Sequence, residues 1–271
     1  MLNKPYYSNV YVVLVYKNID VLSDFFKSLK MTDSKVIVVN SFYDHATNSD
    51  CKDVALKNGA DFIPISNKGY GYGNNIGTKY AMDHYLYDFL IVSNSDIEIK
   101  SFERLKLYSG KNMVIAPKTI MRTGKYQNPD TPWELKFIYP MLSYALNHRS
   151  GILYTMCHIC TRLNREIFRV YAFFVKKNKY KIFSAHGSFI IFTRKAVESL
   201  YPFFDEDMFL YNEEWYLALK ARMKNVPIYY IPSIEVLHLE GASSGSIVYS
   251  EQDRLSFNIL NEKRKKNLII Q

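Results

Sequence analysis

The sequence has few cysteines and no long apolar run, and both features narrow the class of protein. Three cysteines are an odd number for a chain of 271 residues, which is typical of the reducing cytosol rather than of a disulfide-stabilised secreted domain. Cys157 and Cys160 form a single CxxC pair, and since zinc needs more ligands than two, we interpret both thiols as incidental. No window of about 18 uncharged apolar residues predicts a spanning helix.

The N-terminus also lacks the features of a secretory signal peptide. Residues 1–16 have no charged segment followed by an uninterrupted apolar stretch and a small-residue cleavage site. We therefore expect a mature cytoplasmic chain that begins with a strand. A hydrophobic content of 48% is enough for a sizeable core in one large domain or two small ones.

Acidic residues are scarce between positions 133 and 181, where nine Lys or Arg residues face only Glu134 and Glu166. This segment therefore carries most of the formal net charge of +9. Such a concentration predicts an anionic partner, either membrane headgroups or a phosphorylated substrate. No nucleic-acid motif accompanies it, so nucleic acid is not expected as the partner.

Part of this basic segment has a helical pattern. The apolar residues Phe168, Tyr171, Ala172 and Val175 fall on one helical face, and four basic residues lie close by, namely Arg165, Arg169, Lys176 and Lys179. A basic amphipathic helix of this kind predicts peripheral contact with an anionic membrane. The alternative is a helical insert that packs on its own domain and keeps a solvated basic face.

Strand and helix patterns alternate over the first ~100 residues, as in a parallel sheet with right-handed crossovers. Buried strands are expected at 10–16, 35–39, 62–65 and 89–92, and the apolar stripe after Asp20 predicts a helix. Further strands are expected at 114–117, 189–192, 227–231 and 234–237, and a helix at 251–271. This order is typical of an α/β nucleotide-binding fold.

The stretch FLIVSNSDIEI at 89–99 contains the first candidate site residue. Its four apolar residues end abruptly at Ser93, and Asp96 follows where ligands collect in open α/β sheets, beyond the carboxyl ends of the strands. Asp96 is therefore a candidate ligand of a phosphate-bridging metal. A polar turn after the strand is the alternative interpretation.

A glycine-rich stretch, NKGYGYGNNIG at 67–77, precedes an expected helix. Glycine permits positive φ and close backbone approach, and a helix N-terminus favours anions. We therefore expect a turn that binds phosphate, although the GxGxxG spacing of dinucleotide sites is missing. A flexible surface turn is the alternative.

Two adjacent carboxylates, Glu213 and Glu214, begin another expected helix, for which Asn212 is a suitable N-cap. On pattern alone, acidic residues in a first turn need only stabilise the helix through its dipole.

Several pieces in this order resemble the bacterial family 2 glycosyltransferases, especially their rhamnosyltransferase-like branch. The pieces are VVLVYKN at 12–18, KVIVVNS at 35–41, NKGYGYGNNIG at 67–77, FLIVSNSDIEI at 89–99, GSFIIFTRKAVESL at 187–200, FFDEDMFLYNEEWYLALKAR at 203–222 and IPSIEVLHLEGAS at 231–243. The resemblance implies a GT-A type fold, with a Rossmann-like, mostly parallel sheet flanked by helices and a helical basic and aromatic insert. It implies a single domain, 1–271, with a nucleotide-sugar-binding half at 1–121, the insert at 122–185, a catalytic and acceptor half at 186–249 and a C-terminal helix at 250–271.

The resemblance also assigns roles to residues. Glu214 aligns with the general base that deprotonates the acceptor hydroxyl, and Glu213 is its catalytic neighbour or the alternative base. Asp96 and His238 would hold Mg²⁺ or Mn²⁺ against the donor diphosphate, for which hard oxygen ligands are suited. The residues expected to bind the nucleotide-sugar are Val15, Tyr16, Asn40, Gly69, Asn74, Asn94, Ser95 and Asp96.

Three positions depart from the family pattern. Asn40 replaces an acid that often contacts the nucleobase, Tyr216 replaces a second acid after the base, and Lys220 replaces a common Arg. The donor is therefore expected to be UDP- or dTDP-linked without a more specific assignment.

The implied function is an inverting, metal-dependent transferase that extends a saccharide or lipid-linked acceptor in surface polysaccharide (capsule) synthesis. It would act in the cytoplasm, peripherally at the inner face of the plasma membrane. The alternative is a non-catalytic nucleotide- or saccharide-binding partner of the same fold. A sugar-1-phosphate nucleotidyltransferase would need a basic glycine-rich loop after the first strand, and VYKNIDVLSDF at 15–25 has none.

Overall fold

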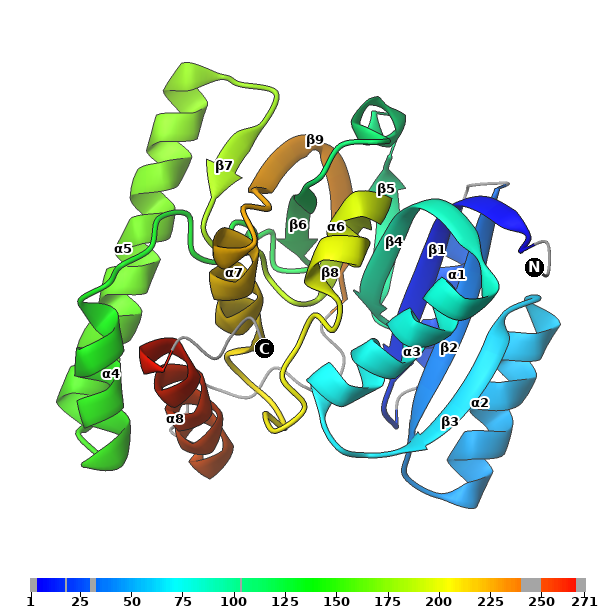
Figure 1. Cartoon of the computed structure of the whole chain (residues 1–271), viewed down its shortest axis with the longest axis horizontal. Coiled ribbons are helices and arrows are strands. Elements are labelled where there is room, and N and C mark those ends of the chain that lie inside the picture. The colour runs from blue at the N-terminus through cyan, green and yellow to red at the C-terminus, as the bar shows by residue number, and fades with distance from the viewer. Residues whose placement is uncertain (1–3, 18, 30–32, 103, 240–249, 267–271) are drawn as a thin grey trace.

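A computed structural model describes residues 4–17, 19–29, 33–102, 104–239 and 250–266, whose strands form one large sheet with helices on both faces (Figure 1). The apolar runs expected to be strands are strands, since backbone pairing satisfies their buried polar groups. The strands are β1 (Tyr6–Val15), β2 (Ser34–Phe42), β3 (Asp61–Ser66), β4 (Leu86–Asn94), β5 (Ile97–Ser101), β6 (Val114–Met121), β7 (Tyr180–Ile182), β8 (Phe189–Thr193) and β9 (Ile228–His238).

The sheet has the order β3-β2-β1-β4-β8-β6-β9-β5, with β7 also paired to β9. Its first four strands are parallel. In the other half β8 is antiparallel to β4 and β6, whereas β6 and β9 are parallel. The predicted α/β fold with a flanked, Rossmann-like sheet is confirmed, and its parallel character is concentrated in β1 to β4.

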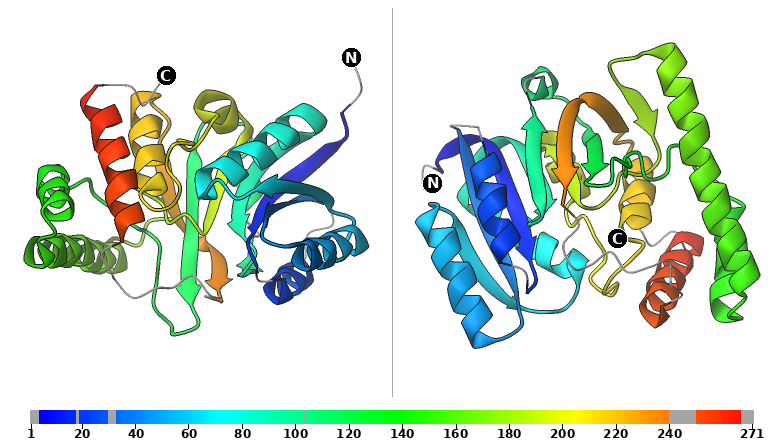
Figure 2. Two further views of the ribbon diagram at one scale, coloured as in Figure 1. Left: turned by 90° about the horizontal axis from the view of Figure 1, so that it is seen from below. Right: turned by 180° about the vertical axis from the view of Figure 1, so that it is seen from behind.

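Helices cover both faces of the sheet. The core on one face packs beneath α3, α6 and α7, and the core on the other face packs beneath α1 and α2. A third apolar cluster joins α4, α5, α7 and α8 beside the sheet (Figures 1 and 2). The helices are α1 (Asp20–Ser28), α2 (His45–Lys57), α3 (Tyr70–His84), η1 (Leu105–Tyr108), α4 (Ile138–Asn147), α5 (Gly151–Val175), α6 (Arg194–Leu200), α7 (Glu213–Met223) and α8 (Glu251–Lys265).

The glycine-rich stretch differs from the expected turn, because most of it lies inside α3. Only Gly69, the residue before the helix, has a positive φ, of 108°. Gly73 and Gly77 let the helix approach β1 closely, since an added Cβ would stand 2.5 Å from Leu14 and 2.3 Å from Val12. These glycines are packing positions, not turn positions.

The two strands expected at 227–231 and 234–237 are one strand, β9. Its pairing with β6 shifts register after Pro117, so that Ile231 lies opposite Pro117 and Glu235 opposite Lys118. This irregularity accommodates Pro232, which lacks the N–H needed for regular pairing. The small-residue loop expected after His238 falls on 240–249, and the end of the C-terminal helix on 267–271, both outside the described residues.

The basic insert forms α4 and α5, and part of the predicted apolar face of α5 packs on the protein. Phe168 is 2% exposed, and its ring lies 5.5 Å from that of Tyr180 and 6.1 Å from that of Tyr230. Tyr171 and Val175 of the same predicted face are 39% and 41% exposed. None of the described helices is both long and apolar enough to cross a membrane.

Candidate active site

The turn after β4 places Asp96 beside His238, the last residue of β9. Ile97 is the register partner of His238, and the Leu239 N–H donates to the Asp96 carbonyl over 2.8 Å. Asp96 Oδ1 lies 3.2 Å from His238 Nε2, and both side chains are buried. Two segments about 140 residues apart therefore bring together the two residues that the resemblance assigns to the metal.

The chemistry of this pair fits a cation. His238 Nδ1 lies 2.7 Å from Gln127 Oε1, so the tautomer with its proton on Nδ1 donates to this oxygen and offers the Nε2 lone pair to a cation. Nε2 makes no hydrogen bond and faces a carboxylate oxygen at a spacing suited to two neighbouring ligands of one ion. Within the described residues no cluster of three or more His, Cys, Asp or Glu side chains could hold a metal alone.

Glu214 lies at the start of α7 on the wall of a cavity of about 360 Å³. The cavity separates the sheet end from α4, α5 and the start of α8. Its polar wall includes Asp130 and three residues of α5, namely His158, Thr161 and Arg165. The insert thus forms one side of the cavity that contains the predicted base.

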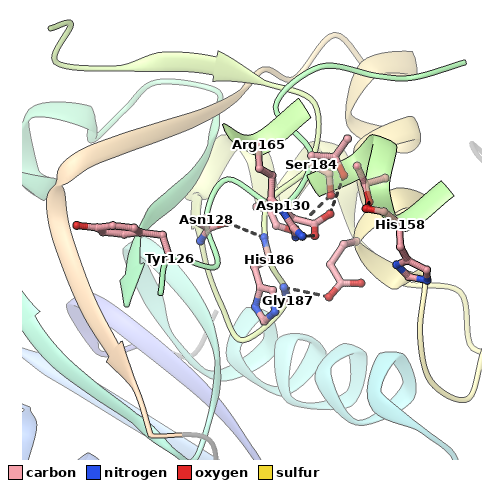
Figure 3. A network of polar contacts seen from close by, with 12 residues as sticks. Tyr126, Asn128, Asp130, His158, Arg165, Ser184, His186 and Gly187 are labelled. Carbon is pink, nitrogen blue, oxygen red and sulfur yellow. Dashed lines mark hydrogen bonds and ion pairs between the residues drawn. The ribbon is translucent and has the colours of Figure 1, made fainter. Parts of the chain in front are cut away.

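His186 and Gly187 connect this cavity to the Asp96–His238 pair. Figure 3 shows both residues near Asp130 and Arg165 of the cavity wall. The Gly187 backbone N–H donates to Glu214 Oε1 over 3.1 Å. The neighbouring His186 donates from its backbone to Asn128 Oδ1 over 2.7 Å, and its ring centroid lies 6.1 Å from that of His238. Residues 186–187 therefore connect both candidate halves of one site.

The two glutamates differ in their surroundings. Burial, and then the charge of Asp130, raises the pKa of Glu214 to about 7. Burial, and then the charge of Glu214, raises the pKa of Glu213 to about 8. Glu213 is 3% exposed, its Oε1 has no hydrogen-bond partner, and it is not among the residues that line the cavity. Only Glu214 faces space that an acceptor can enter.

The start of α7 departs from the expected capping. Asn212 has a φ of 68° and makes no side-chain cap; instead its Nδ2 donates to Asp253 Oδ1 over 2.8 Å. Two residues that differ from the family pattern lie farther along the helix in buried positions. Tyr216 packs in the third apolar cluster, and Lys220 Nζ donates to the Pro202 carbonyl over 2.5 Å. Both residues therefore support α7 rather than enter the cavity.

The residues expected to bind the nucleotide gather at the carboxyl edge of the parallel strands. Val15 is the register partner of Asn40, and Asn94 that of Leu14. The Val15 side chain is in the core, which leaves only its backbone for a ligand, whereas Tyr16 is 47% exposed. Asn40 is buried and donates to Asn48 Oδ1 over 2.9 Å, and Ser95 is buried in the turn before Asp96.

The start of α3 is partly occupied by the chain itself. Gly69 lies against the Phe209 backbone, and the Tyr70 N–H donates to the Phe209 carbonyl over 2.9 Å. Asn74 is buried and donates to the Tyr70 carbonyl over 3.0 Å. Gly69 and Tyr70 therefore hold the start of α3 against the loop that precedes Glu214, whereas the Asn74 bond lies within α3. This leaves fewer donors for a phosphate than the turn interpretation implied.

The sequence patterns did not single out Gln127, Asp130, His158 or His186 as site residues. Asp130 lies between Pro129 and Thr131 in a loop without periodicity, and His158 lies on a helix whose face could not be assigned. Of these four residues, His186 has a local sequence pattern that could have identified it, because it immediately precedes Gly187, Ser188 and a buried strand. These residues reach the site through loops and the insert.

Comparison with known proteins gives a relative in sequence and several relatives in fold. No protein-family model matches the chain. The chain is 22% identical over 251 residues, 91% of its length and 72% of the relative's, to the low-salt glycan biosynthesis hexosyltransferase Agl10 of Haloferax volcanii.

Solved structures share the fold at low sequence identity. GalNAc-T7 with UDP, GalNAc and Mn²⁺ matches 97% of the chain and 48% of its own length, with a TM-score of 0.62 and 13% identity. The mannosyltransferase PcManGT of Pyrobaculum calidifontis, with GDP-Man and Mn²⁺, matches 88% of the chain and 58% of its own length, with a TM-score of 0.54 and 12% identity. TarS of S. aureus matches 86% of the chain and 37% of its own length, with a TM-score of 0.54 and 13% identity.

The chain spans between about a third and three fifths of the lengths of these solved structures. It has the GT-A glycosyltransferase fold, and the curated relative together with this fold supports a glycosyltransferase enzyme.

Proposed function

We propose that the chain is an inverting, metal-dependent glycosyltransferase that uses a nucleotide-sugar. The observation that carries the proposal is the connection between two features. A cavity with Glu214 on its wall is tied through His186 and Gly187 to a buried Asp96–His238 pair that can accept a cation. A transferase needs such an arrangement, because the base and the leaving diphosphate lie on opposite sides of the transferred sugar.

Asp96 and His238 would hold Mg²⁺ or Mn²⁺, with Gln127 fixing the imidazole. When bound, the cation neutralises charge on the departing nucleoside diphosphate. The nucleotide of a UDP- or dTDP-linked donor would lie along the strand edge near Tyr16, Asn40 and Asn94. Support comes from the parallel strands that end there, since ligands of open α/β sheets collect at that edge.

Glu214 would act as the general base. Its carboxylate takes the proton of the acceptor hydroxyl, the hydroxyl oxygen forms the new bond to the anomeric carbon, and the bond to the diphosphate breaks on the opposite face. The configuration is therefore inverted. The position of Glu214 on the cavity wall and its pKa near 7 support this role, since a base is most effective with a pKa near the working pH. Glu213 supports the base from the core.

The acceptor would be a saccharide, free or linked to a lipid, and the product a surface polysaccharide such as a capsule. The glycan-related name of the curated relative supports a saccharide acceptor. We also propose a cytoplasmic position with peripheral contact at the inner face of the plasma membrane, which the basic insert supports.

The test is a screen of UDP- and dTDP-sugars with Mn²⁺ against saccharide and lipid-linked acceptors, measuring diphosphate release and glycosylated product. The donor and acceptor that give product are then used to assay the variants Asp96→Ala and Glu214→Gln. Glu198→Gln, an equivalent change at an exposed side chain of α6, is the matched control. We expect both site variants to lose at least about a hundredfold in turnover and the control to keep it. Unchanged turnover in both site variants would overturn the assignment, and nucleotide binding without transfer would favour the non-catalytic alternative.

A further inference from the structure

The outer face of α5 carries a continuous apolar stripe that is distinct from the face predicted from the sequence. Its side chains are between 47% and 77% exposed. The stripe consists of Ile152, Met156, Ile159, Leu163, Ile167, Val170 and Phe174. Single exposed apolar side chains are common on protein surfaces, but a contiguous apolar surface marks an interaction site.

The spacing of the stripe indicates the shape of its partner. Its steps are four, three and four residues, then again four, three and four, which is an 11-residue repeat with a period of about 3.67 residues per turn. This period is close to that of a straight α-helix, so the stripe runs parallel to the helix axis over about 33 Å. A left-handed coiled coil with a second copy requires a period of 3.5 instead, and the right-handed pairing that an 11-residue repeat also permits is distinguished by the sedimentation measurement below. A straight stripe suits a flat partner.

The charges around the stripe indicate an anionic partner. Arg149 precedes the helix, Lys176 and Lys177 follow it, and all three are exposed. Arg162 is exposed along one flank. The only acid between positions 135 and 181 is Glu166, which Arg169 pairs at 2.6 Å. An apolar strip bordered by cations and almost without acids is the pattern of a helix at a membrane interface.

We propose that α5 docks on an anionic lipid bilayer through this stripe, lying in the plane of the membrane. Figures 1 and 2 show α5 at the outer edge of the molecule, away from the parallel strands, so a flat surface can reach it. Phe173 and Phe174, which are 70% and 75% exposed at the end of the helix, enter the interface first. Lys176 and Lys177 meet the headgroups beside them.

The opposite side of the same helix lines the cavity with His158, Thr161 and Arg165. Docking therefore places the cavity about one helix diameter, ~10 Å, from the bilayer surface. This part of the inference rests on the proposed function. At this distance from the bilayer, a saccharide attached to a membrane lipid reaches the cavity. The acceptor is therefore a lipid-linked saccharide rather than a free one.

Flotation of the purified full chain with vesicles tests the docking. Vesicles of phosphatidylglycerol and phosphatidylcholine are expected to bind the protein, and phosphatidylcholine vesicles to bind it at least about tenfold less. Ile159→Glu combined with Leu163→Glu should reduce binding to the anionic vesicles about tenfold or more. Leu56→Glu combined with Leu107→Glu adds the same charge at exposed apolar positions on α2 and η1, and should leave binding close to that of the unmodified protein.

The docking proposal fails if the unmodified protein does not float with anionic vesicles, or if both double variants bind equally. It also fails if sedimentation shows a dimer that the α5 variant, but not the control, dissociates, since a second copy would then cover the stripe. Thermal unfolding of both variants confirms that they fold. Binding of UDP with Mn²⁺, measured without vesicles, tests the nucleotide site separately; if it is absent while flotation holds, the proposed function fails and the docking surface stands.

Discussion

The Gly187 N–H donates to Glu214 Oε1 over 3.1 Å, and the carbonyl of the same Gly187 accepts from the Tyr70 hydroxyl over 2.6 Å. One residue, Gly187, is therefore held between the candidate base and α3 through its two flanking peptide groups. Because Tyr70 lies on α3 and Glu214 on α7, Gly187 fixes the carboxylate relative to α3. The position of the base depends on backbone geometry that a small substitution can disturb.

We expect Gly187→Ala to lower turnover by about 10- to 100-fold with little loss of stability. The added Cβ would lie 2.7 Å from Glu214 Oε1, so the flexible carboxylate end must move while the backbone stays. A displacement of about 1 Å at a catalytic group is enough for a loss of this size. Steady-state kinetics measures the turnover of the variant. The affinity for UDP with Mn²⁺ is the control and should be unchanged. Unchanged turnover would show that this contact does not position the base.

Activity should rise with pH through neutrality. A base acts only when ionised, and burial raises the pKa of Glu214 to about 7. We expect kcat/KM to increase about tenfold per pH unit below pH 6 and to level off near pH 8. A pH profile of the active donor and acceptor pair measures this. A profile that is flat from pH 5 to 8 would contradict the assignment of Glu214.

The buried Glu213 predicts a pH dependence of stability in the opposite direction. Its pKa is about 8 in the folded protein, against an ordinary value of 4.5. Between pH 4.5 and about 8, the folded protein therefore keeps a proton on Glu213 that the unfolded chain has lost. The free energy of unfolding therefore falls as the pH rises through this window. We expect Tm to fall less between pH 5 and 8 in Glu213→Gln than in the unmodified protein. Parallel curves would show that Glu213 does not titrate in this range.

Gln127 should control metal affinity without touching the metal. Its Oε1 holds His238 Nδ1 at 2.7 Å and so aims Nε2 at Asp96. We expect Gln127→Ala to weaken Mn²⁺ binding in the presence of UDP by about 10- to 100-fold, as removal of such a partner does at other metal sites. Titration calorimetry measures it.

Gln127→Glu is the matched control, because a carboxylate at this position still accepts from Nδ1. We expect it to keep most of the affinity that Gln127→Ala loses. Equal loss in both variants, or in neither, would show that the orientation of His238 is set by other contacts.

The sequence predicted those parts of the molecule that depend on local pattern. Buried apolar runs such as 89–92 became strands, and Asp96 lies beyond one of them beside His238. Such features follow from hydrophobic periodicity and from the way parallel strands end at a common edge.

What could not be predicted depends on contacts between distant segments. The helical face of α5 that packs inward could not be identified from the sequence, because both faces are apolar and only the third cluster and the end of the sheet decide between them. Asp130 and His186 enter the site from loops whose conformation no periodicity records. The glycine run was also misread, since close helix packing and a turn require the same residue.

This distinction yields the last prediction, because packing glycines and open glycines respond differently to alanine. At Gly77 a Cβ would lie 2.3 Å from Val12 Cγ1 and 2.7 Å from Val39 Cγ2, both on buried strands, whereas at Gly151 it meets nothing within 4 Å. We expect Gly77→Ala to destabilise the protein by about 1–3 kcal/mol, the usual cost of overpacking a core. Gly151→Ala, in the first turn of α5, should change the free energy of unfolding by no more than about 1 kcal/mol, in the stabilising direction. Urea denaturation of both variants measures the difference; equal stabilities would mean that α3 can move away from β1 and that Gly77 is not needed for this packing.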